Sequence, residues 1–303
     1  MDQYHQILCL TLKETGKNKV LEAVKALEAR PDVLSAEPDY LVAVEENPDD
    51  SYYSLEQWGP QKINLTDAWD YVTGTSTFCV GVLDTGIYKA HNDLNDNVNA
   101  DYSRDCRTSP VSTVSSVTDP NGHGTHVAGI IGAIGSNSQG VSGVCWNTKL
   151  VSLRVLDELG VGSVSSYERA INYATSTLTD DISINNIRIL NMSLGNWTSD
   201  SGWSGVLCAI SIYPGLVVCS AGNDSRDNDI IPHYPSQFTN QLDNVISVGA
   251  STELDEIADF SNYGETTVDI FAPGDDILSC FPYARCSSTN CTVAGHFAYG
   301  YHS

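Results

Sequence analysis

Three residues whose types suit catalysis stand at the ends of apolar segments in this chain. Asp84 closes the run TFCVGVLD, His123 opens an apolar stretch within NGHGTHVAG, and Asn223 follows GLVVC and a Ser-Ala-Gly turn. An imidazole can act as a general base, a carboxylate can orient that imidazole, and a side-chain amide can donate to a developing oxyanion. Asp84, His123 and Asn223 are therefore the candidate catalytic residues.

Each candidate also has a purely structural explanation. Asp84 could cap its loop, and Asn223 could occupy a turn because asparagine favours turns. His126, about one helical turn after His123, is expected to face the core. Two histidines three residues apart could bind a metal, but no glutamate of an H-E-x-x-H pattern accompanies them, so we expect no metal at this pair.

The segments that carry these residues predict a parallel sheet. Apolar runs indicate strands at 77–84, 149–157, 187–195, 215–223, 244–251 and 267–274. Helices are expected between them, at 126–135, 163–178 and 201–213. This alternation predicts an α/β fold with a doubly wound, mostly parallel sheet and helices on both faces. In such sheets, functional groups collect beyond the carboxyl ends of the strands.

The N-terminal part has a different pattern. We predict a strand at 6–13, an amphipathic helix at 17–29 and one or two strands at 31–44, followed by an acidic linker. The chain is therefore expected to contain a small α+β unit over residues 1–46 and a larger domain over residues 47–303.

The composition argues against several classes of partner. The chain carries 15 Lys and Arg against 38 Asp and Glu, a net charge of −23, which disfavours nucleic acid and anionic lipid. No apolar run reaches the roughly 18 residues of a membrane span, and the N-terminus lacks a signal-peptide pattern. Nine cysteines do not fix the compartment, although Cys280, Cys286 and Cys291 are close enough in sequence for one disulfide.

Seven ordered sequence blocks resemble the subtilisin family of serine proteases, in a thermitase-like form. They are VLDTGI, NGHGTHVAG, NMSLG, SAGN, ISVGA, FSNYG and FAPG. The resemblance implies a Ser-His-Asp endopeptidase in which Asp84 orients His123, His123 transfers the proton and Asn223 donates to the oxyanion. It also implies an edge that binds extended substrate and a pocket for the side chain before the scissile bond. The edge would be formed by Ser193, Leu194 and Gly195, and the pocket would be lined by Ser220, Ala221 and Gly222.

The chain departs from this family at the nucleophile. No block like G-T-S-M-A-x-P-H occurs, and Ser287 and Ser288 lie in a cysteine-rich loop without a preceding Gly-Thr. The final segment AYGYHS looks like the lead-in to the missing block. We therefore expect the chain to stop just before its nucleophile, and to be unstable and inactive as it stands. A pseudoenzyme that lost its serine, a peptide-binding module and a structural or adhesive domain are the alternatives.

The resemblance further implies a calcium ion and a prosegment. Oxygen donors suit calcium, and the matching positions are Asp50, Asp93, Asn137 and the carbonyl groups near Gln139 and Val141. Solvated acidic loops are the alternative to this site. The block VLEAVKALEARPDVLSAEPDY resembles an inhibitory propeptide, so residues 1–46 would act in cis as the prosegment of a zymogen. We expect an extracellular or cell-surface monomer that acts on proteins or peptides.

Overall fold

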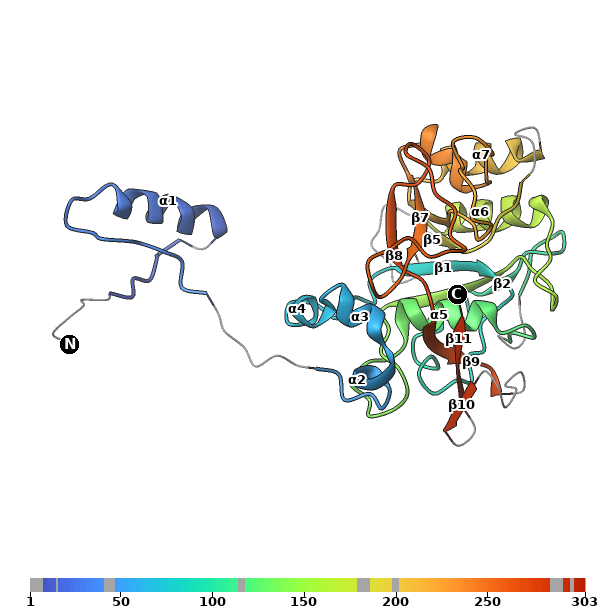
Figure 1. Cartoon of the computed structure of the whole chain (residues 1–303), viewed down its shortest axis with the longest axis horizontal. Helices are drawn as coiled ribbons and strands as arrows, with labels where there is room; N and C mark the ends of the chain where they lie inside the picture. Colours follow the sequence, from blue (N-terminus) through green and yellow to red (C-terminus); the bar gives the residue numbers. More distant parts are fainter. Residues whose placement is uncertain are drawn as a thin grey trace. The chain divides into compact units, whose positions relative to one another are not determined.

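The computed structural model describes residues 8–14, 16–40, 47–113, 118–178, 186–197, 202–283, 291–294 and 297–302. The chain divides into two compact units, Met1–Glu45 and Glu46–Ser303. Figure 1 shows α1 of the smaller unit in dark blue, and the larger unit in colours from lighter blue at α2 to red at β11.

The N-terminal unit contains the predicted helix but not the predicted strands. Helix α1 spans Lys17–Glu28, whereas the described residues 8–13 and 31–40 form no strand. No residue of α1 is buried, and Leu8 and Leu34 are 78% and 98% exposed. A sheet needs an apolar face to pack against, and the apolar residues of α1, such as Val20, Val24 and Leu27, are only half-buried. The expectation of strands is therefore wrong for these residues.

The larger unit is built on an eight-stranded sheet with the order β3-β2-β4-β1-β5-β6-β7-β8. All neighbouring strands are parallel except β2 and β3, which are antiparallel. The strands are β1 Cys79–Asp84, β2 Arg104–Asp105, β3 Ser112–Thr113, β4 Lys149–Arg154, β5 Ile187–Met192, β6 Leu216–Ser220, β7 Val245–Ser251 and β8 Ile270–Pro273. The predicted doubly wound, mostly parallel sheet is confirmed.

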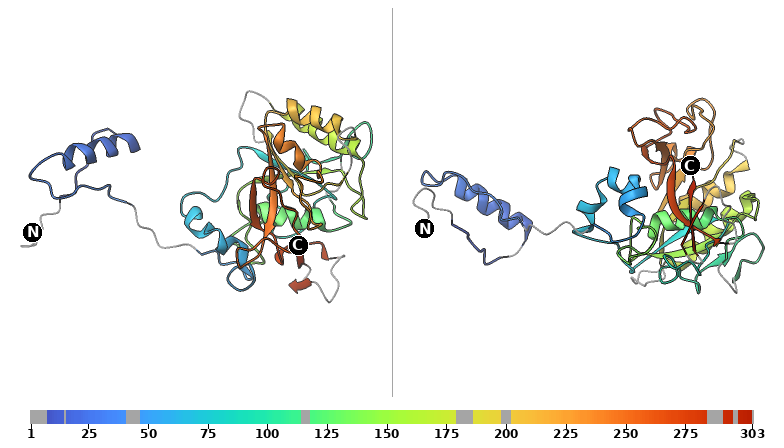
Figure 2. Two further views of the ribbon diagram at one scale, coloured as in Figure 1. Left: turned by 45° about the horizontal axis from the view of Figure 1, so that its top comes forward. Right: turned by 60° about the horizontal axis from the view of Figure 1, so that its bottom comes forward.

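Helices cover both faces of this sheet (Figures 1 and 2). Every residue of β1 is buried, and its side chains alternate between two cores, as the pleat requires. Cys79 and Leu83 pack with residues of α6 and α7, whereas Val80 and Val82 pack with residues of α5. The main helices are α5 His123–Gly132, α6 Val164–Thr177 and α7 Ser204–Ile212.

Short helices precede the sheet. They are α2 Tyr53–Glu56, α3 Trp58–Lys62 and α4 Leu65–Trp69. A 3₁₀ helix, η2, spans Ser236–Asn240 between β6 and β7. Tyr53, Leu65, Trp69 and Trp146 form a separate buried cluster, in which Trp69 lies 4.7 Å from Trp146 between ring centroids. This cluster anchors the short helices to the loop that precedes β4.

A second sheet near the C-terminus was not predicted. Its strands are β9 Ile277–Phe281, β10 Cys291–Ala294 and β11 Phe297–His302, in the antiparallel order β10-β11-β9. The sequence suggested only a cysteine-rich loop there, because strand pairing is a non-local property. Cys280 is a buried free thiol of β9, while Cys286 and the side chain of Cys291 lie outside the described residues. The disulfide allowed by the sequence therefore does not include Cys280.

Candidate active site

A direct contact joins the end of β1 to the start of α5. Asp84 is the last residue of β1 and is fully buried, and His123 is the first residue of α5. Nδ1 of His123 lies 2.8 Å from Oδ1 and 2.9 Å from Oδ2 of Asp84. The His123 side chain is 33% exposed. The buried carboxylate thus holds one ring nitrogen of an imidazole that reaches solvent, which is the geometry of a general base with an orienting partner.

Glycine at position 124 makes this contact possible. A Cβ added to Gly124 would lie 2.1 Å from the carbonyl oxygen of Gly86 and 3.0 Å from the Cβ of Asp84. The first turn of α5 therefore rests directly on the chain that leaves β1. Gly122, which precedes the helix, has φ of 113°, a conformation that glycine adopts without strain.

A second carboxylate, which the sequence analysis missed, ties these two elements together. Oδ1 of Asp119 accepts hydrogen bonds from Thr85 Oγ1 at 2.8 Å, Asn121 N at 3.1 Å and Gly122 N at 2.9 Å. Its Oδ2 accepts from the backbone N and the Oγ1 of Thr125 at 2.9 and 2.7 Å. Asp119 is 4% exposed. Its position four residues before His123, next to Pro-Asn-Gly, was the only signal in the sequence.

The two carboxylates act on the titration of His123. Burial of the ring lowers its pKa, but the charge and hydrogen bonds of Asp84 and the charge of Asp119 together outweigh burial. The pKa of His123 is therefore raised above its usual value, because the surrounding charges favour the imidazolium.

The other predicted site residues follow neighbouring strands. Ser193, Leu194 and Gly195 come directly after β5, and Ser220, Ala221 and Gly222 end or follow β6. β1, β5 and β6 are successive parallel neighbours, so these segments lie at the edge of the sheet where Asp84 ends β1. The substrate-binding roles given to the six residues stay predictions.

Asn223 lies in an exposed loop that buried amides hold in place. Nδ2 of Asn228 and Nδ2 of Asn262 both donate to the carbonyl oxygen of Ala221 at 2.8 Å. Oδ1 of Asn262 accepts from the backbone N of Asp224 at 2.9 Å. The loop is therefore anchored on both sides of Asn223, although its role as an oxyanion donor stays a prediction.

His126 occupies the structural position that the sequence suggested. It is 3% exposed, and its Nε2 lies 2.9 Å from the carbonyl oxygen of Ile277 in β9. Ser279 Oγ donates to the carbonyl oxygen of His126 at 2.7 Å. His126 thus joins α5 to β9 through both its ring and its backbone carbonyl group.

Comparison with known proteins decides the family. The model of the Subtilase family (Peptidase_S8) matches residues 75–302. The chain belongs to the subtilase family. This subtilase is 36% identical over 270 residues to a thermophilic serine proteinase from a Bacillus species. The matched region covers 88% of this chain and 62% of that protein. It is 32% identical over 246 residues to thermitase from Thermoactinomyces vulgaris, covering 80% of each chain.

Solved structures agree with this assignment. A protease from Pseudoalteromonas arctica matches with a TM-score of 0.69 and 26% identity, over 85% of this chain and 82% of that one. A cold-adapted subtilisin-like serine proteinase matches with a TM-score of 0.56 and 28% identity, over 70% and 67% of the two chains. The subtilase spans less than two thirds of several curated relatives, for example 46% of halolysin from Haloferax mediterranei.

Some relatives carry their location in their names. They include an extracellular protease from Xanthomonas campestris, 33% identical, and a minor extracellular protease from Bacillus subtilis, 32% identical. In the described part of this subtilase, no helix has both the length and the apolar character that crossing a membrane requires.

The predicted calcium ligands converge in the larger unit. Asp50 is 4% exposed, and its Oδ2 accepts from Ser136 N and Ser142 Oγ, both at 2.7 Å. Asp93 accepts from Asn137 Nδ2 at 3.0 Å and from Val141 N at 3.1 Å. The Gln139 backbone N donates to Oδ1 of Asn137 at 2.9 Å. Three separated segments thus meet around two buried carboxylates.

One oxygen of this group favours a cation. Oδ1 of Asp50 is buried and has no hydrogen-bond partner among the described residues, and burial raises the pKa of this carboxyl group. A buried carboxylate oxygen without a donor is costly unless a cation compensates it. The residues present therefore fit a hard cation with oxygen ligands such as calcium.

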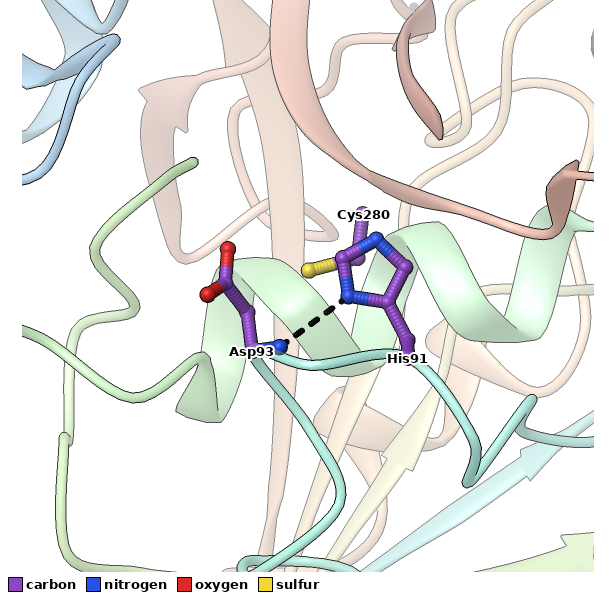
Figure 3. A group of neighbouring side chains, drawn as sticks. All are labelled: His91, Asp93 and Cys280. Atoms are coloured by element: carbon purple, nitrogen blue, oxygen red, sulfur yellow. Dashed lines mark hydrogen bonds between the residues drawn. The ribbon is translucent and has the colours of Figure 1, made fainter. Parts of the chain in front are cut away.

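Asp93 also belongs to a buried group with His91 and Cys280, shown in Figure 3. One potential ligand atom from each residue lies within 4.8 Å of the others. The backbone N of Asp93 donates to His91 Nδ1 at 3.2 Å (Figure 3). Since the carboxylate of Asp93 is itself hydrogen bonded to the loop at Asn137 and Val141, we interpret this group as the contact that fixes that loop against β9.

Proposed function

We propose that this subtilase is part of a serine endopeptidase that hydrolyses peptide bonds in proteins or peptides. The observation that supports it best is the paired contact between the buried Asp84 carboxylate and Nδ1 of the solvent-accessible His123. A carboxylate that binds Nδ1 leaves Nε2 as the nitrogen that serves the reaction.

In this proposal His123 and Asp84 move and stabilise one proton. Nε2 of His123 takes the proton of a serine hydroxyl as that oxygen attacks the peptide carbonyl, and then gives it to the leaving amine. Asp84 holds the tautomer and stabilises the imidazolium. Asn223 donates a hydrogen bond to the oxyanion of the tetrahedral intermediate.

The serine itself is proposed to follow Ser303, in a block of the G-T-S-M-A type. Ser287 and Ser288 lie outside the described residues and are not proposed as nucleophiles. Residues 1–303 alone are accordingly not expected to cleave peptide. Substrate would add as an extended strand to Ser193–Gly195, because backbone hydrogen bonding is available at the end of a strand.

We further propose a structural calcium ion and a zymogen. Asp50, Asp93, Asn137 and the carbonyl groups of Gln139 and Val141 would hold the ion, which supplies charge compensation rather than reaction chemistry. The N-terminal unit would act as a prosegment in cis, removed by cleavage within residues 45–50. The extracellular names of two relatives support secretion of the mature enzyme.

A fluorophosphonate probe tests the proposed function. A version of the chain that carries the proposed serine block after Ser303 should react with the probe, and labelling should be lost in the His123→Ala and Asp84→Ala variants. His126→Ala is not a suitable control, because the ring of His126 joins α5 to β9. Asp157→Ala, in an exposed loop, is the suitable control. No labelling of wild type would favour a peptide-binding module instead, whereas labelling that persists without His123 would contradict the role of His123 as the base.

A further inference from the structure

A buried histidine that the proposed reaction does not use lies between the two segments assigned to substrate binding. His233 is 4% exposed. The next residue, Tyr234, exchanges two backbone hydrogen bonds of 3.0 Å with Asn196, which forms an isolated antiparallel bridge. The chain at His233 therefore runs beside the segment that leaves β5.

The imidazole of His233 packs directly against two glycines. A Cβ added to Gly195 would lie 2.2 Å from Cε1 and 2.6 Å from Nε2 of His233. A Cβ added to Gly222 would lie 3.0 Å from Cδ2 and 3.1 Å from Nε2 of the same ring. Gly195 follows β5 and Gly222 follows β6, and these two strands are paired. One edge of the ring thus faces both segments and fills the space between them.

Neighbouring side chains hold this ring in place. Nδ1 lies 3.0 Å from Ser236 Oγ, whose hydroxyl donates to the carbonyl oxygen of His233 at 2.9 Å. Because that hydroxyl has a single proton, Nδ1 is the donor to it. Trp197 meets the imidazole edge-on with 5.2 Å between ring centroids, and the guanidinium of Arg226 lies 4.5 Å from the centre of the Trp197 ring. An incoming side chain could not easily displace the imidazole.

The ring is also uncharged near neutral pH. Burial lowers the pKa of His233 to about 4, because the charged form is poorly solvated there. The imidazole therefore offers bulk, and no positive charge that would select acidic substrates.

We propose that His233 forms the base of the subsite for the side chain that precedes the scissile bond, and that it restricts this subsite to small side chains such as those of glycine, alanine and serine. The inference rests on the proposed function, because it takes Ser193–Gly195 and Ser220–Gly222 as the walls of that subsite. An aromatic or long side chain would compete with the imidazole for the same space, and overpacking of this kind is unfavourable.

Peptide binding to the chain of residues 1–303 tests this without a nucleophile, after the dispersed amide signals of its NMR spectrum have shown that wild type is folded. Acetyl-Ala-Ala-Pro-Ala amide and acetyl-Ala-Ala-Pro-Phe amide would be titrated into wild type and His233→Gly, with Kd measured by NMR. Wild type should bind the alanine peptide more tightly. His233→Gly should improve binding of the phenylalanine peptide by about tenfold or more and leave the alanine peptide within about twofold, which also shows that the site is folded.

Two further variants separate bulk from hydrogen bonding. Ser236→Ala removes the partner of Nδ1 but keeps the ring, so the preference for alanine should remain. His233→Ser is a milder change, for use if His233→Gly does not fold. It should shift the preference in the same direction as His233→Gly.

A wild-type preference for the phenylalanine peptide contradicts the subsite but not the proposed function. A ratio of the two Kd values that no His233 substitution changes does the same. If neither peptide binds, the assigned substrate edge is contradicted, and the subsite is contradicted with it. The proposed hydrolysis is judged separately, by fluorophosphonate labelling.

Discussion

At the scale of single residues, the pair of Asp84 and His123 makes a prediction about titration. Asp84→Asn should lower the pKa of His123, because the raised pKa depends on the charge and the hydrogen bonds of Asp84. NMR titration of the His123 ring measures this directly. Asp157→Asn is the matched control, because Asp157 accepts hydrogen bonds from the backbone N of Leu159 and Val161 and does not touch the histidine. Equal pKa values in Asp84→Asn and wild type would refute the pairing.

The same pair makes stability depend on pH. The folded-state pKa of His123 is raised above the ordinary value of 6.5, so its contribution to stability is complete below pH 6.5 and is lost as pH rises through the folded-state pKa. The free energy of unfolding of wild type should therefore exceed that of Asp84→Asn by more at pH 6 than at pH 9. A difference that grows with pH would contradict this assignment.

The residues that could be predicted from sequence are those with a local signal. Asp84 and His123 stand at a strand end and at a glycine-flanked helix start, and glycine at position 124 reports the close approach of the two elements. Asp119 and His233 could not be predicted in the same way. Their partners lie on segments that only the folded chain brings near, such as Thr85 for Asp119 and Gly195 for His233.

At the scale of elements, the seating of α5 on β1 decides whether the site forms. Gly124→Ala would force a Cβ to 2.1 Å from the Gly86 carbonyl oxygen, so we expect a loss of about 1–3 kcal/mol from overpacking. Urea unfolding measures it. The control is Gly205→Ala in α7, whose Cβ would have the flexible carboxylate end of Glu168 as its nearest neighbour, at 2.8 Å. This change should be neutral, or stabilising by up to about 1 kcal/mol. Equal effects in the two variants would show that α5 tolerates separation from β1.

The loops around Asp50 and Asp93 carry the prediction for calcium. Calcium should raise the Tm, with about 2.7 kcal/mol of stabilisation at a free concentration of 100 times Kd, and a chelator should reverse the shift. Asp50→Ala should remove the response. Asp70→Ala is the control, since Asp70 is exposed and lies outside these loops. A Tm that calcium leaves unchanged in wild type would argue against the ion.

Elements with strong sequence patterns were predictable, and elements that depend on distant partners were not. Six strands of the large sheet, β1 and β4 to β8, lie in the predicted apolar runs, and α6 and α7 lie within their predicted ranges. The two-residue polar strands β2 and β3 were not predicted. The strands expected at 6–13 and 31–44 rested on short apolar runs that the described N-terminal unit does not bury. β9, β10 and β11 escaped prediction because their strands, ILSCF, CTVA and FAYGYH, are defined by pairing between segments that are separated in the chain.

At the scale of the whole molecule, the larger unit holds the two cores, the paired site and the calcium loops, while the N-terminal unit exposes its leucines. Leu8, Leu10 and Leu34 are 78%, 59% and 98% exposed, so this unit has apolar surface available for a partner. That property is consistent with the proposed prosegment. The sequence predicted a boundary after residue 46, and the compact units divide after residue 45.

Hydrolysis by a version of the chain that carries the proposed serine block after Ser303 tests the central claim most directly. We would measure kcat/KM on a peptide amide for wild type, His123→Ala and Asn223→Ala, with Asp157→Ala as control. The account predicts near-complete loss without His123 and, for Asn223→Ala, a loss in rate of about 10²–10³, the value known for removing the corresponding amide from subtilisin. Hydrolysis that continues at the wild-type rate without His123, or no hydrolysis by the wild-type version that carries the serine block, would contradict it.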